Sequence, residues 1–106
     1  MTKEEFKSIV SHYKGKITEN DVCIKIENKN RIKSHYQDGS VHEDKVVQCE
    51  ISYRKSNGGL WGQEETHRIQ GGFASPPPIS KEFLESELFR YGFELKESEQ
   101  LSLFDL

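Results

Sequence analysis

A two-residue alternation of apolar and polar side chains over residues 45–55 constrains the fold more strongly than any other part of the sequence. Successive side chains of a β-strand point to opposite faces, so this alternation predicts a strand with one buried and one solvated face. A turn is expected at residues 57–59, Asn-Gly-Gly, and residues 60–70 can pair back as the second arm of a hairpin. The buried face of the first strand would carry Val47, Cys49, Ile51 and Tyr53.

Helices are predicted on both sides of this hairpin in the sequence. Thr2 and Glu5 have the spacing of a capping box, and apolar residues recur behind them at helical intervals until Gly15. A second helix is expected to begin at the N-cap residue Ser80 and to end at Gly92. The apolar side chains that these helices would turn toward the core are Phe6, Ile9, Val10, Tyr13, Phe83, Leu84, Leu88 and Tyr91.

The remaining segments predict a small antiparallel sheet of three to four strands. Residues 22–27 alternate as a half-buried strand, a turn is expected at residues 28–30, and residues 31–36 can form a second, more polar strand. Two glycines at 71–72 and three prolines after Ser75 predict the end of the sheet, because proline has no N–H to donate. The predicted fold class is α+β, a two-layer sandwich of this sheet with an N-terminal and a C-terminal helix.

Length and composition fit one small domain with a tail. The chain has 106 residues, of which 1–95 are expected to form the domain and 96–106 a flexible tail, since the polar run after Leu95 has no apolar period. A formal net charge of -3 offers no broad positive footprint for nucleic acid. No run of apolar residues is long enough to cross a membrane, so we expect a cytoplasmic protein without a membrane partner. The sequence leaves the oligomeric state open.

Metal and catalytic sites have no recognisable pattern in the sequence. The four histidines are far apart and the two cysteines are not closely spaced, so no metal and no cofactor are predicted. A phosphate loop, a nucleophile elbow or a constellation of carboxylates cannot be identified, and we expect the protein not to be an enzyme. In a cytoplasmic protein, Cys23 and Cys49 are expected to be free thiols.

A weak signal for nucleic-acid binding surrounds the predicted hairpin turn. Tyr53, Arg54, Lys55 and Trp61 combine aromatic rings with positive charge, as proteins that bind single strands do. Aromatic residues at strand ends more often pack on their neighbours, and two glutamates in the following strand reduce the positive field. We therefore expect the protein to reach DNA indirectly, through a protein partner.

The last seven residues, Gln100-Leu101-Ser102-Leu103-Phe104-Asp105-Leu106, are large and apolar at four positions, although a polar segment precedes them. Apolar side chains on a flexible tether are typical of a short peptide that enters a pocket on another protein. The first five residues resemble the motif with which bacterial polymerases and other partners bind the β sliding clamp. That motif is a glutamine, a leucine, a serine or aspartate, a leucine and a phenylalanine. All five positions match, and the resemblance covers these five residues alone.

The resemblance implies a role for each residue of the tail motif. Gln100 would hydrogen-bond in a polar subsite, Leu101 would cover a shallow patch, and Ser102 is the permitted serine. Leu103 and Phe104 would enter a deep apolar pocket. Each buried Leu or Phe side chain is worth about 1.5–3 kcal/mol, and ordering the tail costs about 1 kcal/mol per residue. The surplus predicts a dissociation constant of about one micromolar.

The sequence therefore predicts a non-enzymatic accessory or regulatory protein of DNA replication or repair that binds the clamp through its tail. The tail would recruit the domain to DNA or compete with polymerases for the clamp. The small size fits a protein of a phage or another mobile element. Two alternatives stay open. One is a binding module that inhibits a host or defence protein and uses the tail as a strand of its own fold. The other is a small nucleic-acid enzyme that the clamp brings to DNA.

Overall fold

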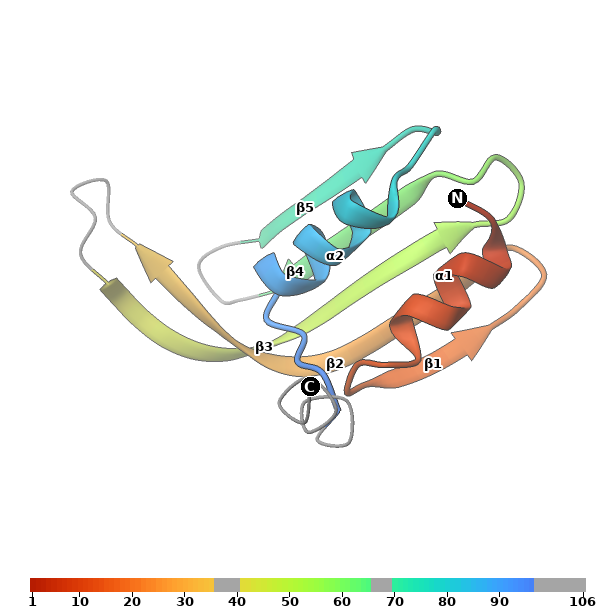
Figure 1. Cartoon of the computed structure of the whole chain (residues 1–106). Helices are drawn as coiled ribbons and strands as arrows, with labels where there is room; N and C mark the ends of the chain where they lie inside the picture. Colours follow the sequence, from red (N-terminus) through yellow and green to blue (C-terminus); the bar gives the residue numbers. More distant parts are fainter. Residues whose placement is uncertain (36–40, 66–69, 97–106) are drawn as a thin grey trace.

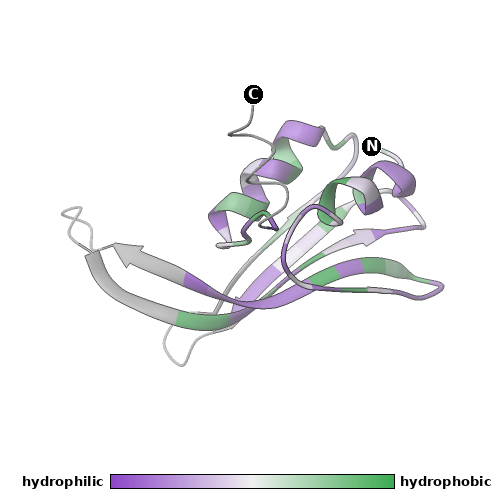
Figure 2. Ribbon diagram, turned by 60° about the horizontal axis from the view of Figure 1, so that its bottom comes forward, coloured by the Kyte–Doolittle hydropathy of each residue, from purple (hydrophilic) through white to green (hydrophobic). Residues whose placement is uncertain are grey.

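The computed structural model describes residues 1–35, 41–65 and 70–96 of the chain. Within these ranges, five strands form one antiparallel sheet in the order β1-β2-β3-β4-β5, and two helices lie on one side of it (Figures 1 and 2). The predicted α+β class is confirmed, whereas the predicted number of three to four strands is wrong. The elements are α1 (Lys3–Val10), β1 (Lys16–Glu19), β2 (Cys23–His35), β3 (Val41–Arg54), β4 (Leu60–Glu65), β5 (Gln70–Ser75) and α2 (Lys81–Arg90).

Both helices begin where their capping residues predict. The Thr2 hydroxyl accepts a hydrogen bond from the backbone N–H of Glu5 at 3.2 Å, and the Glu5 carboxylate accepts one from the Thr2 N–H at 3.4 Å. At the start of α2, the Ser80 hydroxyl accepts from the Phe83 N–H at 3.0 Å. Such caps satisfy N–H groups that have no partner inside the helix, so local sequence is enough to fix these helix starts.

The core lies between the helix layer and the sheet. Its side chains come from both helices, from the three central strands and from the segments beside α2, and the rings of Phe6 and Tyr53 stack with centroids 5.5 Å apart. The predicted inward faces of α1, α2 and β3 are confirmed, but α1 ends at Val10, before the predicted Gly15, so Tyr13 lies beyond the helix. The buried hydrophobic residues are Phe6, Val10, Ile24, Ile26, Val47, Cys49, Ile51, Tyr53, Leu60, Ile79, Leu84, Leu88, Tyr91 and Phe93.

The turn predicted at residues 28–30 is wrong, because β2 runs without interruption for 13 residues. Two asparagines in the middle of this strand use their side chains for hydrogen bonds. The side-chain N–H group of Asn28 donates to the Asn30 Oδ1 at 2.8 Å, and that of Asn30 donates to the Tyr91 carbonyl at 3.0 Å. Tertiary partners thus hold asparagines in a strand although they favour turns.

Two strands appear where none was expected. The short β1 pairs with β2, with Ile17 opposite Ile26, and completes one edge of the sheet. The other edge is β5, which includes the glycines that were predicted to end the sheet. Gly62 on β4 makes this pairing favourable, because a Cβ at that position would collide with the ring of its cross-strand partner Phe73. The prolines end β5 at Ser75, as expected.

The two cysteines lie on opposite faces of the sheet. Cys49 is fully buried on the face that the helices cover, whereas Cys23 pairs with Arg54 in the register and belongs to the other face. Both are free thiols, as predicted. Burial raises the pKa of the Cys49 thiol to about 11. In the described parts of the chain, neither helix has the length and apolarity that a membrane crossing needs.

Candidate functional site

The tail motif at residues 100–104 lies outside the described residues, and we call the last described segment before it, residues 93–96, the exit. The Lys14 N–H donates to the Glu94 carbonyl at 2.8 Å, and the Lys96 N–H donates to the His12 carbonyl at 2.9 Å. An isolated β-bridge joins Tyr13 and Leu95. Backbone contacts therefore hold the chain through Lys96.

The end of α2 directs the chain toward this exit. Gly92 follows α2 with a φ of +77°, a conformation that glycine adopts without strain, and the Phe93 N–H bonds the Leu88 carbonyl at 2.9 Å. A Cβ at Gly92 would approach the Arg31 carbonyl to 2.9 Å, so the chain crosses close to β2. The buried Asn30 amide holds the same turn through the Tyr91 carbonyl.

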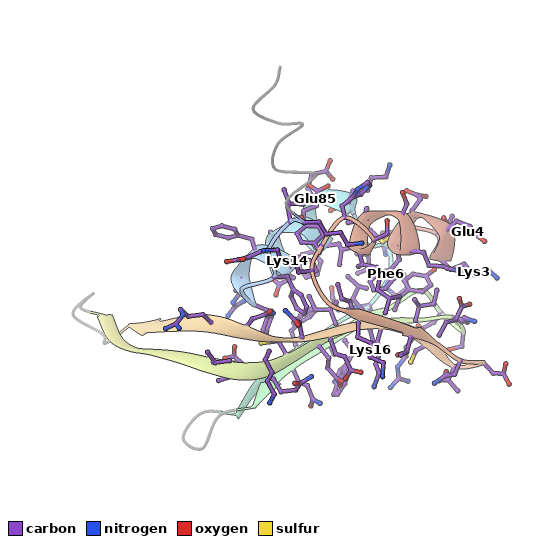
Figure 3. The ribbon with its side chains drawn as sticks, turned by 90° about the horizontal axis from the view of Figure 1, so that it is seen from below. Lys3, Glu4, Phe6, Lys14, Lys16 and Glu85 are labelled. Carbon is purple, nitrogen blue, oxygen red and sulfur yellow. The ribbon has the colours of Figure 1, made fainter. Side chains whose placement is uncertain are left out.

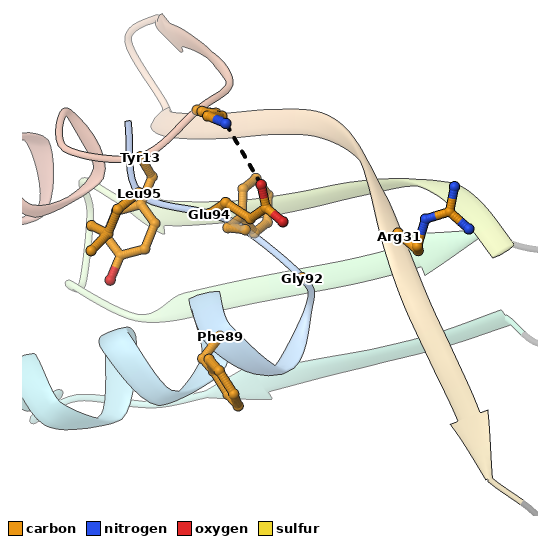
Figure 4. Close-up of a pocket in the computed structure, with 8 residues that line it drawn as sticks. Tyr13, Arg31, Phe89, Gly92, Glu94 and Leu95 are labelled. Carbon is orange, nitrogen blue, oxygen red and sulfur yellow. Dashed lines mark ion pairs between the residues drawn. The ribbon is translucent and has the colours of Figure 1, made fainter. Parts of the chain in front are cut away.

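A surface depression of about 600 Å³ lies beside the exit (Figure 4). Phe89 stands at its rim on α2 and is 85% exposed, the largest exposed fraction among the large hydrophobic residues that the structure describes. The Lys14 ammonium and the Glu94 carboxylate form an ion pair of 3.7 Å across it. Its lining mixes aromatic and charged groups: Tyr13, Lys14, Arg31, Phe89, Gly92, Phe93, Glu94 and Leu95.

The residues predicted as weak nucleic-acid contacts are divided between the two faces of the sheet. Tyr53 is 6% exposed, and its hydroxyl donates to the Met1 carbonyl at 3.2 Å, so its ring is part of the core. Lys55 pairs with Glu19 at 2.6 Å. Arg54 and Trp61 lie together on the other face, where they line a depression of about 270 Å³. The structure therefore brings together two of the four predicted residues.

Four further basic residues share the face of Arg54 and Trp61. We call the side of the sheet that neither helix covers the uncovered face. In the strand pairing, Lys25 lies opposite Ser52, and Ser52 lies opposite Trp61 on its other side. Lys29 lies opposite Gln48. The described charged side chains of the uncovered face are five basic residues and two acidic ones: Lys16, Lys25, Lys29, Arg31, Arg54, Glu27 and Glu50.

Sequence reasoning missed this basic group because it divided β2 at a turn that does not exist. In a continuous strand, alternate residues share a face, so Lys25, Lys29 and Arg31 belong together. The signal was that all three basic residues stand at odd-numbered positions. It can be recognised once residues 23–35 are treated as one strand.

Groups that could hold a metal ion do not gather in the described ranges. Across residues 1–35, 41–65 and 70–96, no three His, Cys, Asp or Glu side chains lie close enough to hold a metal ion. Burial raises the pKa of the Glu64 carboxyl on the helix-covered side, while the charge of Arg90 opposes this shift.

Known proteins provide no assignment for this chain. No family model, no curated protein and no solved structure matches it. The function is therefore inferred from the tail motif and from the surfaces of the fold.

Proposed function

We propose that this protein is a non-enzymatic accessory or regulatory protein of DNA replication or repair that binds the bacterial sliding clamp through residues 100–104. The observation that carries the proposal is the five-residue match of Gln100-Leu101-Ser102-Leu103-Phe104 to the clamp-binding motif. A clamp partner implies a cytoplasmic protein. The described residues between Phe6 and Phe93 form a hydrophobic core of their own, which is consistent with the proposal.

The distance between the fold and the motif restricts how the protein would sit on the clamp. The described fold ends at the exposed residue Lys96, and the motif begins at Gln100. An extended chain spans at most about 3.6 Å per residue, so these two positions are at most about 14 Å apart. With the peptide in its pocket, the folded part would stand directly against the clamp surface.

The surface at the exit fits this arrangement. Phe89 and the 600 Å³ depression lie where the chain leaves the fold, so they would face a protein that holds the tail. An exposed aromatic ring beside a bound peptide can add contact area to the five-residue motif. A folded part held this close would also obstruct the clamp pocket, which favours competition with polymerases over loose recruitment.

Calorimetry with a purified bacterial clamp tests the proposal. The intact chain should bind with a dissociation constant near one micromolar or below. Because two anchors would each lose about 1.5–3 kcal/mol, the double variant Leu103→Ala/Phe104→Ala should bind at least about 100-fold more weakly. Leu106→Ala is the matched control, since it removes an apolar tail residue outside the motif and should leave affinity within about threefold. Absence of binding by the intact chain refutes the proposal.

A synthetic peptide of residues 97–106 separates the motif from the surface at the exit. If the folded part contacts the clamp, the intact chain should bind at least about tenfold more tightly than the peptide. Phe89→Ser in the intact chain should then lower its affinity most of the way to that of the peptide. Equal affinities of chain and peptide would show that the tail acts alone, as a simple tether.

A further inference from the structure

We propose that the uncovered face of the sheet binds single-stranded nucleic acid, with Trp61 as the surface on which a base stacks and Arg54 as a phosphate contact. This inference goes beyond clamp binding and does not depend on it. The two activities use different parts of the chain, the tail and the sheet.

Trp61 is presented on this face as an accessible ring. Its cross-strand neighbours are Ser52 on β3 and Ala74 on β5. Ser52 is only 6% exposed although neither helix covers this face. Its low exposure fits its position between the larger side chains of Lys25 and Trp61 on the neighbouring strands. Ala74 is too small to cover the indole, and Trp61 remains 38% exposed. A partly exposed tryptophan between two small cross-strand neighbours suits stacking on a base.

Arg54 lies next to this ring on the uncovered face. It lines the 270 Å³ depression together with Trp61, Ser75 and Pro76. Its side chain is exposed, and within the described ranges it has no ion-pair partner. A guanidinium beside an aromatic ring can bind a phosphate while the ring stacks on the adjoining base.

The charge of the uncovered face favours an anionic partner. Its described side chains carry five positive and two negative charges, a net charge of +3. Lys25 is neutralised in part by Glu50 at 3.7 Å and Glu27 at 4.0 Å. Lys16 and Lys29 have no ion pair with any described residue. Figure 3 shows Lys16 on the opposite side of the sheet from Phe6 and the helices. Positive charge is thus concentrated on the side that carries Trp61.

A nucleic acid fits these features better than an acidic peptide does. An acidic peptide would use the basic groups and leave the open indole without a function. Single strands offer both a row of phosphates and unstacked bases, and sheet surfaces with aromatic side chains are a recurrent way to bind them.

Trp61 is the only tryptophan of the chain, so its fluorescence reports directly on the proposed contact. Titration of the intact protein with twelve-nucleotide oligothymidylate and oligouridylate should quench the emission, and the affinity should fall as salt is raised. A preference for one oligonucleotide identifies DNA or RNA as the ligand. Labelled oligonucleotides, followed by anisotropy, should bind Trp61→Ala at least about fivefold more weakly. Arg54→Ala should lower the slope of log affinity against log salt by about 0.7.

Lys3→Ala is the matched control, because Lys3 is an exposed cation on the helix side (Figure 3). It should leave oligonucleotide binding unchanged. The proposal is overturned if neither oligonucleotide quenches the emission, if Lys3→Ala weakens binding as much as Arg54→Ala, or if polyglutamate quenches equally well. Leu103→Ala/Phe104→Ala should bind oligonucleotides normally, and Arg54→Ala should bind the clamp normally, so the failure of one activity is distinguishable from the failure of the other.

Discussion

Removing the anchors of the tail should leave the stability of the fold almost unchanged. If residues 100–104 are a ligand for another protein, Leu103→Ala/Phe104→Ala removes no core contact and should change the free energy of unfolding by less than about 0.5 kcal/mol. The alternative is that the tail is a strand of the protein's own fold. Two buried apolar side chains would then be lost, at a cost of about 2–5 kcal/mol for each.

Leu88→Ala is the reference variant, because it shows how much stability this fold loses when a buried leucine is truncated. Leu88 is fully buried on α2, and its truncation should cost about 2–5 kcal/mol. For a domain of this size each kcal/mol lowers Tm by about 4–8 °C, so the Leu88 variant should melt at least about 8 °C below the wild type. The tail variant should melt within about 4 °C of it. Thermal unfolding followed by circular dichroism measures both variants, and a fall in the Tm of the tail variant comparable to that of Leu88→Ala would refute the tail as a free ligand.

Three further perturbations test contacts within the fold. Hydrogen bonds from Lys55 and Lys7 lower the pKa of Glu19 to about 2, against 4.5 for a free side chain. The stabilisation is therefore present above pH 4.5 and lost as pH falls toward 2, so the Tm difference between wild type and Glu19→Gln should disappear over that range. Gly62→Ala should destabilise by about 1–3 kcal/mol in urea unfolding, because its Cβ collides with the Phe73 ring, and Phe73→Ala in the same chain should relieve this additional cost. Asn30→Ala should cost about 1–3 kcal/mol in the same assay, since it leaves the buried Tyr91 carbonyl without its side-chain donor.

Local sequence signals predicted the helix starts and the central hairpin. The wrong predictions concern strands whose formation depends on tertiary contacts. Caps at Thr2 and Ser80 act within one helical turn, so the sequence alone fixes them. By contrast, β1 is short and β5 begins with glycines after Gln70, and each becomes a strand because a partner strand lies beside it. The continuity of β2 likewise depends on Asn30 and its long-range bond to Tyr91.

The two candidate binding surfaces differ in how far the sequence alone reveals them. A linear motif keeps its residues adjacent in the chain, so Gln100–Phe104 can be read directly. The uncovered face is assembled from four strands, and its composition depends on the register that pairs Lys25 with Ser52 and Ser52 with Trp61. A net charge summed over the whole sequence does not show which face of the sheet each charge lies on.

The placement of the two thiols allows the uncovered face to be labelled selectively. Cys23 is partly exposed there, whereas Cys49 is sealed in the core and its raised pKa keeps it protonated and unreactive near neutral pH. A maleimide dye should therefore modify Cys23 alone, without any change of sequence. Arg54, its register partner, lies beside the label, so a dye at Cys23 would sense whatever occupies this side of the sheet, and bound ligand would in turn slow the labelling reaction.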